Sequence, residues 1–292
     1  MQQRQAAGMV SSFSPKRLMK ALKRRLTLVR QLPGADVVVV SIKKSGRTWL
    51  RALLTRLFHD TYATPTDLLL DGGNHKALNP AAPSVLFAHD SDPVASVGEM
   101  AADLRVYDGS RVILLVRYPA DTIVSLYHHY RNRKTGSRQR LAATTSIFEF
   151  ASRPGHGIHS IIAFLNNWAR YARHNNKVIM LKYEDLHADT AAELARLAAL
   201  IGVPATPATL DDAIAFASLA NLRKLETQGF FNDVSLRKTG ATNPDALKVR
   251  RGQVKGYTDY FTPGQCAEIE RIIADELDPW YGYQIPPAAA QA

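Results

Sequence analysis

Four short runs of unbroken apolar residues, rich in valine, isoleucine and leucine, constrain the fold of this chain more than any other feature. They lie within Asp36–Ile42, Ser84–Ala88, Arg111–Val116 and Lys177–Leu181. A strand that is apolar at successive positions is buried on both faces of its sheet, and helical segments separate the four runs. The pattern predicts an α/β fold with a mostly parallel central sheet and helices on both of its faces.

Polar residues follow each predicted strand directly. They are Lys43-Lys44-Ser45-Gly46, His89-Asp90, Arg117-Tyr118-Pro119 and Tyr183-Glu184-Asp185. In sheets of this kind the ligand binds beyond the carboxyl ends of the strands. We therefore expect these residues to converge on one site.

Length and charge narrow the class of protein. With 292 residues, 46% of them hydrophobic, the chain can bury the core of one large domain. Its net charge of +11 is uneven, because residues 1–35 hold eight lysines and arginines and no acid, which leaves about +3 for the remainder. A protein that tracks nucleic acid spreads its basic residues over the folded body, so we expect no nucleic acid partner. We predict a basic tail or helix at 1–35 and a single domain at 36–292.

The basic segment has an apolar stripe of its own. Leu18, Leu22, Leu26 and Val29 recur at helical spacing among lysines and arginines. Three interpretations stay open: a helix on a membrane surface, part of an organelle transit peptide, or a terminal helix with one face packed on the domain. No apolar run reaches the roughly 18 to 20 residues of a membrane span. The lone Cys266 excludes an internal disulfide framework. We expect a cytoplasmic protein, with residues 16–30 as its point of weak contact with any membrane surface.

The turn after the first predicted strand is the strongest functional signal. Lys44-Ser45-Gly46-Arg47-Thr48-Trp49 leads from that strand into a helix. Backbone amides at a helix start attract an anion and Lys44 adds a positive charge, so the turn predicts a phosphate cradle. It lacks the order of the nucleoside-triphosphate loop, in which lysine follows the last glycine and a hydroxyl binds the metal. The structural alternative is a capped turn with solvated lysines.

This turn resembles the first motif of the cytosolic-type sulfotransferases, Pro-Lys-Ser-Gly-Thr-Thr-Trp, except at Lys43 and Arg47. The resemblance implies a P-loop-like sulfotransferase fold in which residues 45–48 bind the 5′-phosphosulfate group of 3′-phosphoadenosine 5′-phosphosulfate (PAPS). It also implies that Trp49 stacks on the adenine and that Lys44 neutralises the leaving phosphate. Arg47 replaces a threonine of the family, where it either strengthens phosphate binding or caps the helix.

A second motif follows in the family's order. Arg117-Tyr118-Pro119-Ala120-Asp121, with Ser125 eight residues after the arginine, resembles the family's Arg-Asn-Pro-x-Asp and its serine. An arginine at a strand end grips a phosphate through two hydrogen bonds, and a serine adds a hydroxyl donor, so the pair suits the 3′-phosphate. An ion pair with Asp121 is the structural alternative for Arg117.

The remaining resemblance extends from Val37 to Tyr283. Arg250-Arg251-Gly252 is similar to the family's Arg-Lys-Gly loop, which implies contact with the same 3′-phosphate. Tyr183 matches a tyrosine near the adenine. Ser218 matches less specifically and is expected to contact the cofactor.

His89 occupies the place of the family's catalytic histidine, just after the second strand. An imidazole with its ordinary pKa near 6.5 accepts a hydroxyl proton at neutral pH. The preceding Phe87 and Ala88 depart from the family's Lys-Thr, and Asp90 is a candidate to support the imidazole. A strand-end histidine with a structural hydrogen bond is the alternative. The sequence has no HExxH motif and no Cys/His cluster, so we expect no metal.

Together these residues predict an enzyme that transfers a sulfuryl group from PAPS to an acceptor hydroxyl or amine and releases adenosine 3′,5′-bisphosphate (PAP). Two other classes stay open: an ATP-dependent phosphoryl transferase on a related scaffold, and a noncatalytic protein that binds a nucleotide or an anionic surface. The acceptor, a small molecule, saccharide or lipid, is not identified. Its pocket is expected from loops at 74–83, 131–157 and 229–249, where the arginines of 131–140 fit an acidic or saccharide acceptor and a solvated loop equally well.

Overall fold

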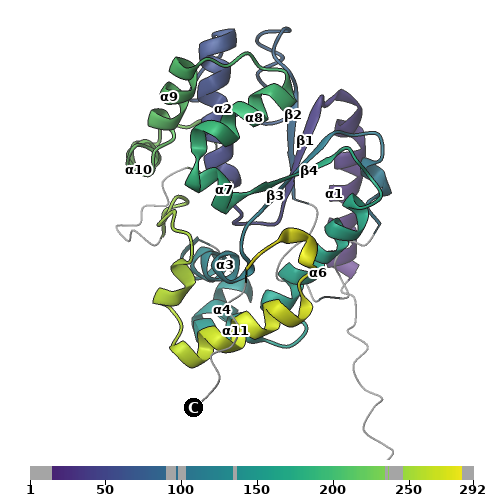
Figure 1. Cartoon of the computed structure of the whole chain (residues 1–292), viewed down its shortest axis with the longest axis vertical. Helices are drawn as coiled ribbons and strands as arrows, with labels where there is room; N and C mark the ends of the chain where they lie inside the picture. The colour runs from purple at the N-terminus through teal and green to yellow at the C-terminus, as the bar shows by residue number, and fades with distance from the viewer. Residues whose placement is uncertain are drawn as a thin grey trace, which may run out of the picture.

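The computed structural model describes residues 15–89, 97, 103–133, 137–233, 236 and 246–284. Within them, a four-stranded parallel sheet of order β2-β1-β3-β4 forms the centre (Figure 1). Its strands are β1 (Val37–Ser41), β2 (Val85–Ala88), β3 (Val112–Val116) and β4 (Val178–Lys182). All four predicted strands and the α/β class are confirmed, and each strand end lies within one residue of its prediction.

The register explains why the runs are so rich in β-branched residues. Val38 of β1 is the partner of Val112 in β3, which in turn is the partner of Val178 in β4. Every residue of β1, β2 and β3 is buried, whereas β4 is partly exposed except at Leu181. Burial on both faces is therefore right for three strands and too strong for β4. An edge position does not by itself expose a strand, because β2 lies at the other edge of the described sheet and is buried.

The helices are α1 (Pro15–Gln31), α2 (Arg47–Tyr62), α3 (Pro119–Arg133), α4 (Ser137–Thr144), α5 (Ile147–Ser152), α6 (Gly157–Ala172), α7 (Tyr183–Ala188), α8 (Thr190–Ile201), α9 (Pro207–Phe216), α10 (Leu219–Gln228) and α11 (Pro263–Glu276). Short 3-10 turns lie at Leu32–Gly34, Arg105–Tyr107, Gly256–Asp259 and Pro279–Tyr281.

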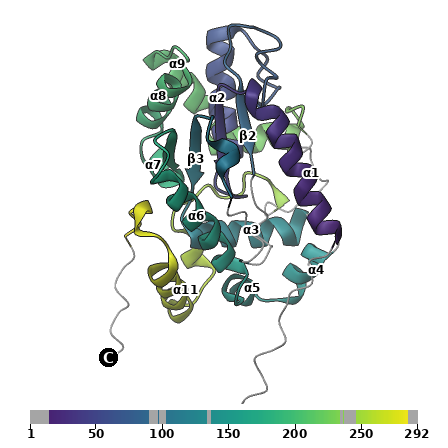
Figure 2. The ribbon, with the colours of Figure 1, turned by 90° about the vertical axis from the view of Figure 1, so that its right-hand side faces the viewer.

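Helices cover both faces of the sheet, as Figures 1 and 2 show from two directions. Successive side chains of a strand point to opposite faces. Val38 and Val40 accordingly pack in one core with α3, α6 and α11, and Val37 and Val39 pack in a second core with α2, α8 and α9. The two cores fix the sheet so that the carboxyl ends of its strands face one common edge.

Helix α1 does not pack on the domain through the apolar stripe that the sequence shows, but through another face. Leu28 is buried in the first core, and Arg25 pairs with Asp103 at 3.1 Å. The large apolar side chains on the other side are 46–53% exposed: Met19, Leu22, Leu26 and Val29. At 100° per residue Leu28 lies well away from Leu22 and Leu26, so packing through it leaves the stripe in solvent. The Leu18 side chain lies outside the described residues.

The arginines of 131–140 do not form the expected loop. Helix α3 continues to Arg133 and α4 begins at Ser137, with residues 134–136 outside the described part of the chain. Arginine, glutamine and alanine are good helix formers, which the emphasis on Gly136 overlooked. The Arg133 side chain is buried and pairs with Glu226 at 2.8 Å, so it is not a solvated loop residue.

Candidate active site

The turn between β1 and α2 leaves the first amides of α2 open. Gly46 is the N-cap of α2, and no side-chain cap bonds to these amides. Its φ of +96° is in the left-handed region, and a Cβ atom there would lie 2.5 Å from Cδ2 of Tyr183. Lys44, two residues earlier, also has a positive φ, 76°. Left-handed backbone at a residue with a side chain costs energy and is concentrated at functional sites.

Lys44 points its ammonium group into a cationic environment. Its Nζ donates to the Lys248 carbonyl at 3.4 Å. Burial lowers the pKa of Lys44 well below its usual range, and the nearby Lys248, Arg133, Arg117 and Arg250 lower it further. An anion bound beside Lys44 would oppose both effects and favour the protonated lysine.

Arg117 links the first turn to a later segment. Its guanidinium lies 4.3 Å from the ring centroid of Tyr183 and donates to the carbonyls of Gln253 at 2.7 Å and Lys44 at 3.4 Å. The ion pair with Asp121 is present but long, 3.9 Å. The Nε atom of Arg117 is buried and has no hydrogen-bond partner in the described structure. The arginine is therefore fixed in orientation with one donor still to be satisfied.

His89 is held by the end of β1. Its Nδ1 lies 2.8 Å from the Ser41 carbonyl oxygen, so Nδ1–H donates to that carbonyl and Nε2 is left with its lone pair. Burial lowers the pKa of His89 well below 6.5, and the charges of Arg47, Lys43 and Lys248 add to this, while the Ser41 bond opposes it. The imidazole is thus neutral at neutral pH. Asp90, the proposed support for the ring, lies outside the described residues.

Two buried carboxylates anchor the later segments at the site. Glu226 of α10, 2% exposed, accepts from Arg133 at 2.8 Å and from the amides of Lys248 and Val249 at 2.7 and 3.2 Å. Asp121 of α3 accepts from the amides of Lys255 and Tyr257 at 2.8 and 2.9 Å. These bonds bring the stretch from Lys248 to Tyr257 against the β1–α2 turn.

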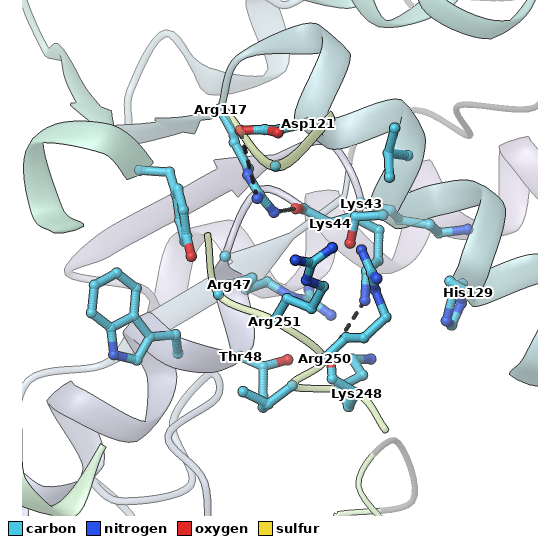
Figure 3. A pocket seen from close by; sticks show the side chains of 18 of the residues that line it. Lys43, Lys44, Arg47, Thr48, Arg117, Asp121, His129, Lys248, Arg250 and Arg251 are labelled. Atoms are coloured by element: carbon cyan, nitrogen blue, oxygen red, sulfur yellow. Dashed lines mark hydrogen bonds and ion pairs between the residues drawn. The ribbon is translucent and has the colours of Figure 1, made fainter. Parts of the chain in front are cut away.

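The β1–α2 turn, His89, Arg117, Asp121 and the Lys248 segment border one cavity of about 240 Å³, and Glu226 is not among its lining residues. Figure 3 shows its cationic side chains gathered closely, with Arg117 and Asp121 at one end and Lys248 at the other. The cations that line it are Lys43, Lys44, Arg47, Arg117, Lys248, Arg250 and Arg251, and among the described lining residues the only acid is Asp121. Such a cavity is suited to a ligand with several negative charges.

Comparison with known families identifies the class of enzyme. The model of the sulfotransferase domain matches residues 104–280, more than half of the chain. The chain belongs to the sulfotransferase family. The predicted resemblance and the predicted activity class, a PAPS-dependent sulfotransferase, are thereby confirmed.

Known sulfotransferases are similar to this one over most of its length. The cytosolic sulfotransferases 15 and 14 of Arabidopsis thaliana are each 28% identical; both matches cover 83% of this chain, and they cover 72% and 75% of those proteins. A retinol dehydratase in complex with retinol and PAP has a TM-score of 0.59 at 17% identity, covering 88% of this chain and 85% of that one. A mouse sulfotransferase complexed with PAP has a TM-score of 0.55 at 16% identity, covering 85% and 88%. The two structures share the fold.

Most of the predicted site residues of this sulfotransferase come together. Those that line the cavity are Lys44, Gly46, Arg47, Thr48, Trp49, His89, Arg117, Ser125, Tyr183, Arg250, Arg251 and Gly252. Ser45 is not among the lining residues; it is fully buried in the same turn. Ser218 lies elsewhere: it is the exposed N-cap of α10, and its hydroxyl accepts from the Asn221 amide at 3.4 Å.

Several residues of the sulfotransferase site were missed from the sequence. Lys248 lines the cavity and belongs to the run Lys-Val-Arg-Arg, so its charge was a usable signal. His129 also lines it, four residues after Ser125 and so on the same face of α3. Glu226 had no comparable signal, because its role depends on contacts with distant segments. Of the three loops expected around the acceptor, only 229–249 contributes described lining residues, and 234–235 and 237–245 lie outside the described part.

The sulfotransferase site fits the PAPS anion. Ser45 Oγ is buried without a hydrogen-bond partner in the described structure, as is Arg117 Nε, and a phosphate or sulfate oxygen would satisfy such donors. The open amides at the start of α2 add further donors. In the described residues, no group of three or more His, Cys, Asp or Glu side chains is placed to bind a metal ion.

Proposed function

We propose that this sulfotransferase transfers the sulfuryl group from PAPS to an acceptor hydroxyl or amine, with His89 as the general base. The observation that carries the proposal is the bond from His89 Nδ1 to the Ser41 carbonyl at 2.8 Å, in a residue that lines the cationic cavity. This bond directs the basic Nε2 away from β1. Nε2 takes the proton of the acceptor as its oxygen or nitrogen forms the bond to sulfur, a contribution of about 10² to 10⁴-fold to the rate.

Lys44 and the first amides of α2 act on the other side of the transfer. Bound PAPS supplies the sulfuryl group, and negative charge collects on the phosphate when the sulfur–oxygen bond breaks. Lys44 Nζ and the α2 amides offset that charge, while Arg117, Ser125, Arg250 and Arg251 hold the 3′-phosphate. Trp49 and Tyr183, whose ring centroids are 5.5 Å apart, accommodate the adenine. Positions fixed before binding make this electrostatic contribution large.

Calorimetric titration with PAP tests the proposal, with ATP plus magnesium and AMP as comparison ligands. We expect PAP to bind without magnesium and more tightly than AMP, because the 3′-phosphate meets Arg117, Arg250 and Arg251. Lys44→Met keeps the length of the side chain and removes its charge, and it should weaken PAP binding. The matched control is Lys177→Met, which removes the charge of an exposed lysine directly before β4 and should leave PAP binding unchanged. Preference for ATP with magnesium would contradict the proposal and support phosphoryl transfer.

The acceptor is proposed to be a small molecule, and the cytoplasm its location. The structurally similar retinol dehydratase was solved with retinol and, in another complex, with androsterone, and the Arabidopsis relatives are named cytosolic. Among the described helices of this chain, none has both the length and the apolarity that crossing a membrane requires.

We also propose that α1 contacts an anionic membrane surface. Met19, Leu22, Leu26 and Val29 form an exposed apolar stripe on a helix that also carries seven lysines and arginines and no acid. Apolar residues beside basic ones favour the interface of an anionic bilayer. The full chain should sediment with vesicles that contain phosphatidylglycerol and not with pure phosphatidylcholine vesicles. The double change Leu22→Gln, Leu26→Gln should abolish sedimentation with these vesicles. Equal sedimentation of the wild type and the variant contradicts the proposal. It is also contradicted if the wild type is a dimer that the same change converts to a monomer, because the stripe is then a dimer interface.

A further inference from the structure

The cavity contains more cationic side chains than the donor requires. The resemblance assigns Lys44, Arg117, Arg250 and Arg251 to the phosphate groups of PAPS, which carries about four negative charges near neutral pH. Lys43 and Lys248 line the same cavity outside the residues that the resemblance assigns to the donor, and Arg47 brings to it a positive charge that the family's threonine at this position lacks. The single described lining acid, Asp121, already accepts from two backbone amides.

These three cations act on His89, the residue at which the acceptor must arrive. Arg47, Lys43 and Lys248 each lower the pKa of its imidazole, and Arg47 is the largest of these charge effects. All three cations line the cavity that His89 also lines. Figure 3 shows Lys43, Arg47 and Lys248 among the cationic side chains that border the cavity.

Arg47 is the distinctive member of this group. It begins α2 at the position where the family motif has threonine, and within the described structure it makes no hydrogen bond or salt bridge. The nearest acids, Asp71 and Asp233, are engaged by Arg51 at 3.5 and 2.8 Å. Burial lowers the pKa of Arg47 to about 10, with a further contribution from Arg51, so the guanidinium remains charged at neutral pH.

The Arg47 side chain lines the cavity and makes no hydrogen bond to the described protein, so its donors are open to a ligand. The planar fork of arginine matches a carboxylate or a sulfate through two parallel hydrogen bonds. We propose that the acceptor of this enzyme carries an anionic group, a carboxylate or a sulfate, which Arg47 binds next to His89. The inference rests on the proposed function, since it takes His89 as the place of proton transfer.

The anion has a second effect on the reaction. A negative group beside Arg47 and Lys248 offsets the charges that make His89 a weak base, so the imidazole becomes more basic when the correct acceptor is bound. A stronger base near the working pH accepts the acceptor proton more effectively. Neutral acceptors of the same shape bring no such gain. Selection for the anion is therefore expected in kcat as well as in KM.

Three phenols of matched shape test the proposal: para-hydroxyphenylacetate, the corresponding sulfonate and the corresponding amide. Turnover is measured at saturating PAPS for the wild type, Arg47→Thr and Arg47→Lys. The wild type should prefer an anionic phenol to the amide by about 10-fold or more in kcat/KM, as expected for a charge-assisted hydrogen bond. The threonine variant should lose this preference, and the lysine variant should keep part of it. The relative rates of carboxylate and sulfonate identify which anion the site takes.

Binding of PAP separates this inference from the proposed function. Arg47→Thr restores the threonine of the family motif, so the turn keeps a hydroxyl donor for the 5′-phosphate and PAP should bind within about twofold of the wild type; a loss of PAP affinity equal to the loss of turnover makes the Arg47 charge a donor contact and overturns the inference. Wild-type protein that fails to bind PAP overturns the proposed function instead.

If the enzyme turns over none of these phenols, the pKa of His89 tests the inference instead. In the PAP complex, the His89 imidazole is titrated by nuclear magnetic resonance with and without phenylacetate or its sulfonate. The anion should raise the pKa of His89 in the wild type and not in Arg47→Thr. No effect of either anion in the wild type overturns the inference.

Discussion

His89 and Ser41 are joined by a hydrogen bond from the imidazole Nδ1 to the backbone carbonyl, 2.8 Å long, across the adjacent ends of β2 and β1. Because the acceptor is a carbonyl of the central sheet, the ring orientation depends on the buried end of β1. The same bond selects the tautomer, since a carbonyl accepts only from a protonated nitrogen. A parallel pair of strands thereby converts an ordinary histidine into a base with a defined reactive nitrogen.

This environment predicts an unusually acidic imidazolium at position 89. Burial and the charges of Arg47, Lys43 and Lys248 lower its pKa well below 6.5. A lowered pKa means that His89 stays neutral as the pH falls through 6.5 and takes up its proton only below that value. Histidine resonances followed by nuclear magnetic resonance in the ligand-free protein check this, with His89→Asn for assignment. A midpoint at or above 6.5 would show that the cavity is less cationic than described.

Lys44 predicts proton uptake when the donor product binds. Its pKa in the free protein is lowered well below 10.5, first by burial and then by four neighbouring cations. Phosphate beside it restores the charge, so between the free and the bound pKa values binding must take a proton from the buffer. Calorimetry of PAP binding at mildly alkaline pH, in buffers with different ionisation enthalpies, measures that uptake. Lys44→Met should remove most of it, and unchanged uptake in this variant would assign the proton to another group.

Gly46 predicts a position where even a methyl group is excluded. An added Cβ would lie 2.5 Å from the Tyr183 ring, and the φ of +96° is unfavourable for any other residue. Through the backbone alone, Gly46→Ala should lower the free energy of unfolding by about 1–3 kcal/mol. The added methyl group should also displace Tyr183 from Arg117 and so weaken PAP binding. Gly34→Ala, with no atom within 4 Å of its added Cβ, is the control. Thermal unfolding and PAP titration of both variants test this prediction. Equal stability and equal PAP affinity of the two variants would contradict the close contact between Gly46 and Tyr183.

The parts that could be predicted from the sequence are those where neighbours along the chain decide the structure. The β-branched runs specify buried parallel strands, and the residues directly after them must reach the same sheet edge, which placed Lys44, His89 and Arg117 correctly. Ser218 shows the limit of a local motif match: its hydroxyl caps α10 and it is not among the cavity-lining residues, so its contact with the cofactor stays a prediction. Glu226 shows the reverse, because its importance arises only when α3, α10 and the Lys248 segment meet.

We predict that Glu226, although it lies outside the cavity, controls the affinity for the donor. Its carboxylate accepts from Arg133 and from the amides of Lys248 and Val249, so it positions the segment that carries Arg250 and Arg251. Glu226→Gln keeps the size and removes the charge. Hydrogen bonds to charged groups contribute about 1.5–3 kcal/mol each, so we expect PAP to bind at least about 10-fold more weakly.

The matched control for that change is Glu193→Gln, which breaks a partly exposed pair with Arg196 on α8, at 2.6 Å. Exposed pairs contribute about 0–1 kcal/mol, so this variant should unfold and bind PAP nearly as the wild type does. Thermal unfolding establishes that Glu226→Gln is folded at the titration temperature. If the folded variant then binds PAP with wild-type affinity, the Lys248 segment does not need its buried anchor. The arginines must then be positioned by Asp121 and by Tyr260, whose hydroxyl accepts from Arg250 and Arg251.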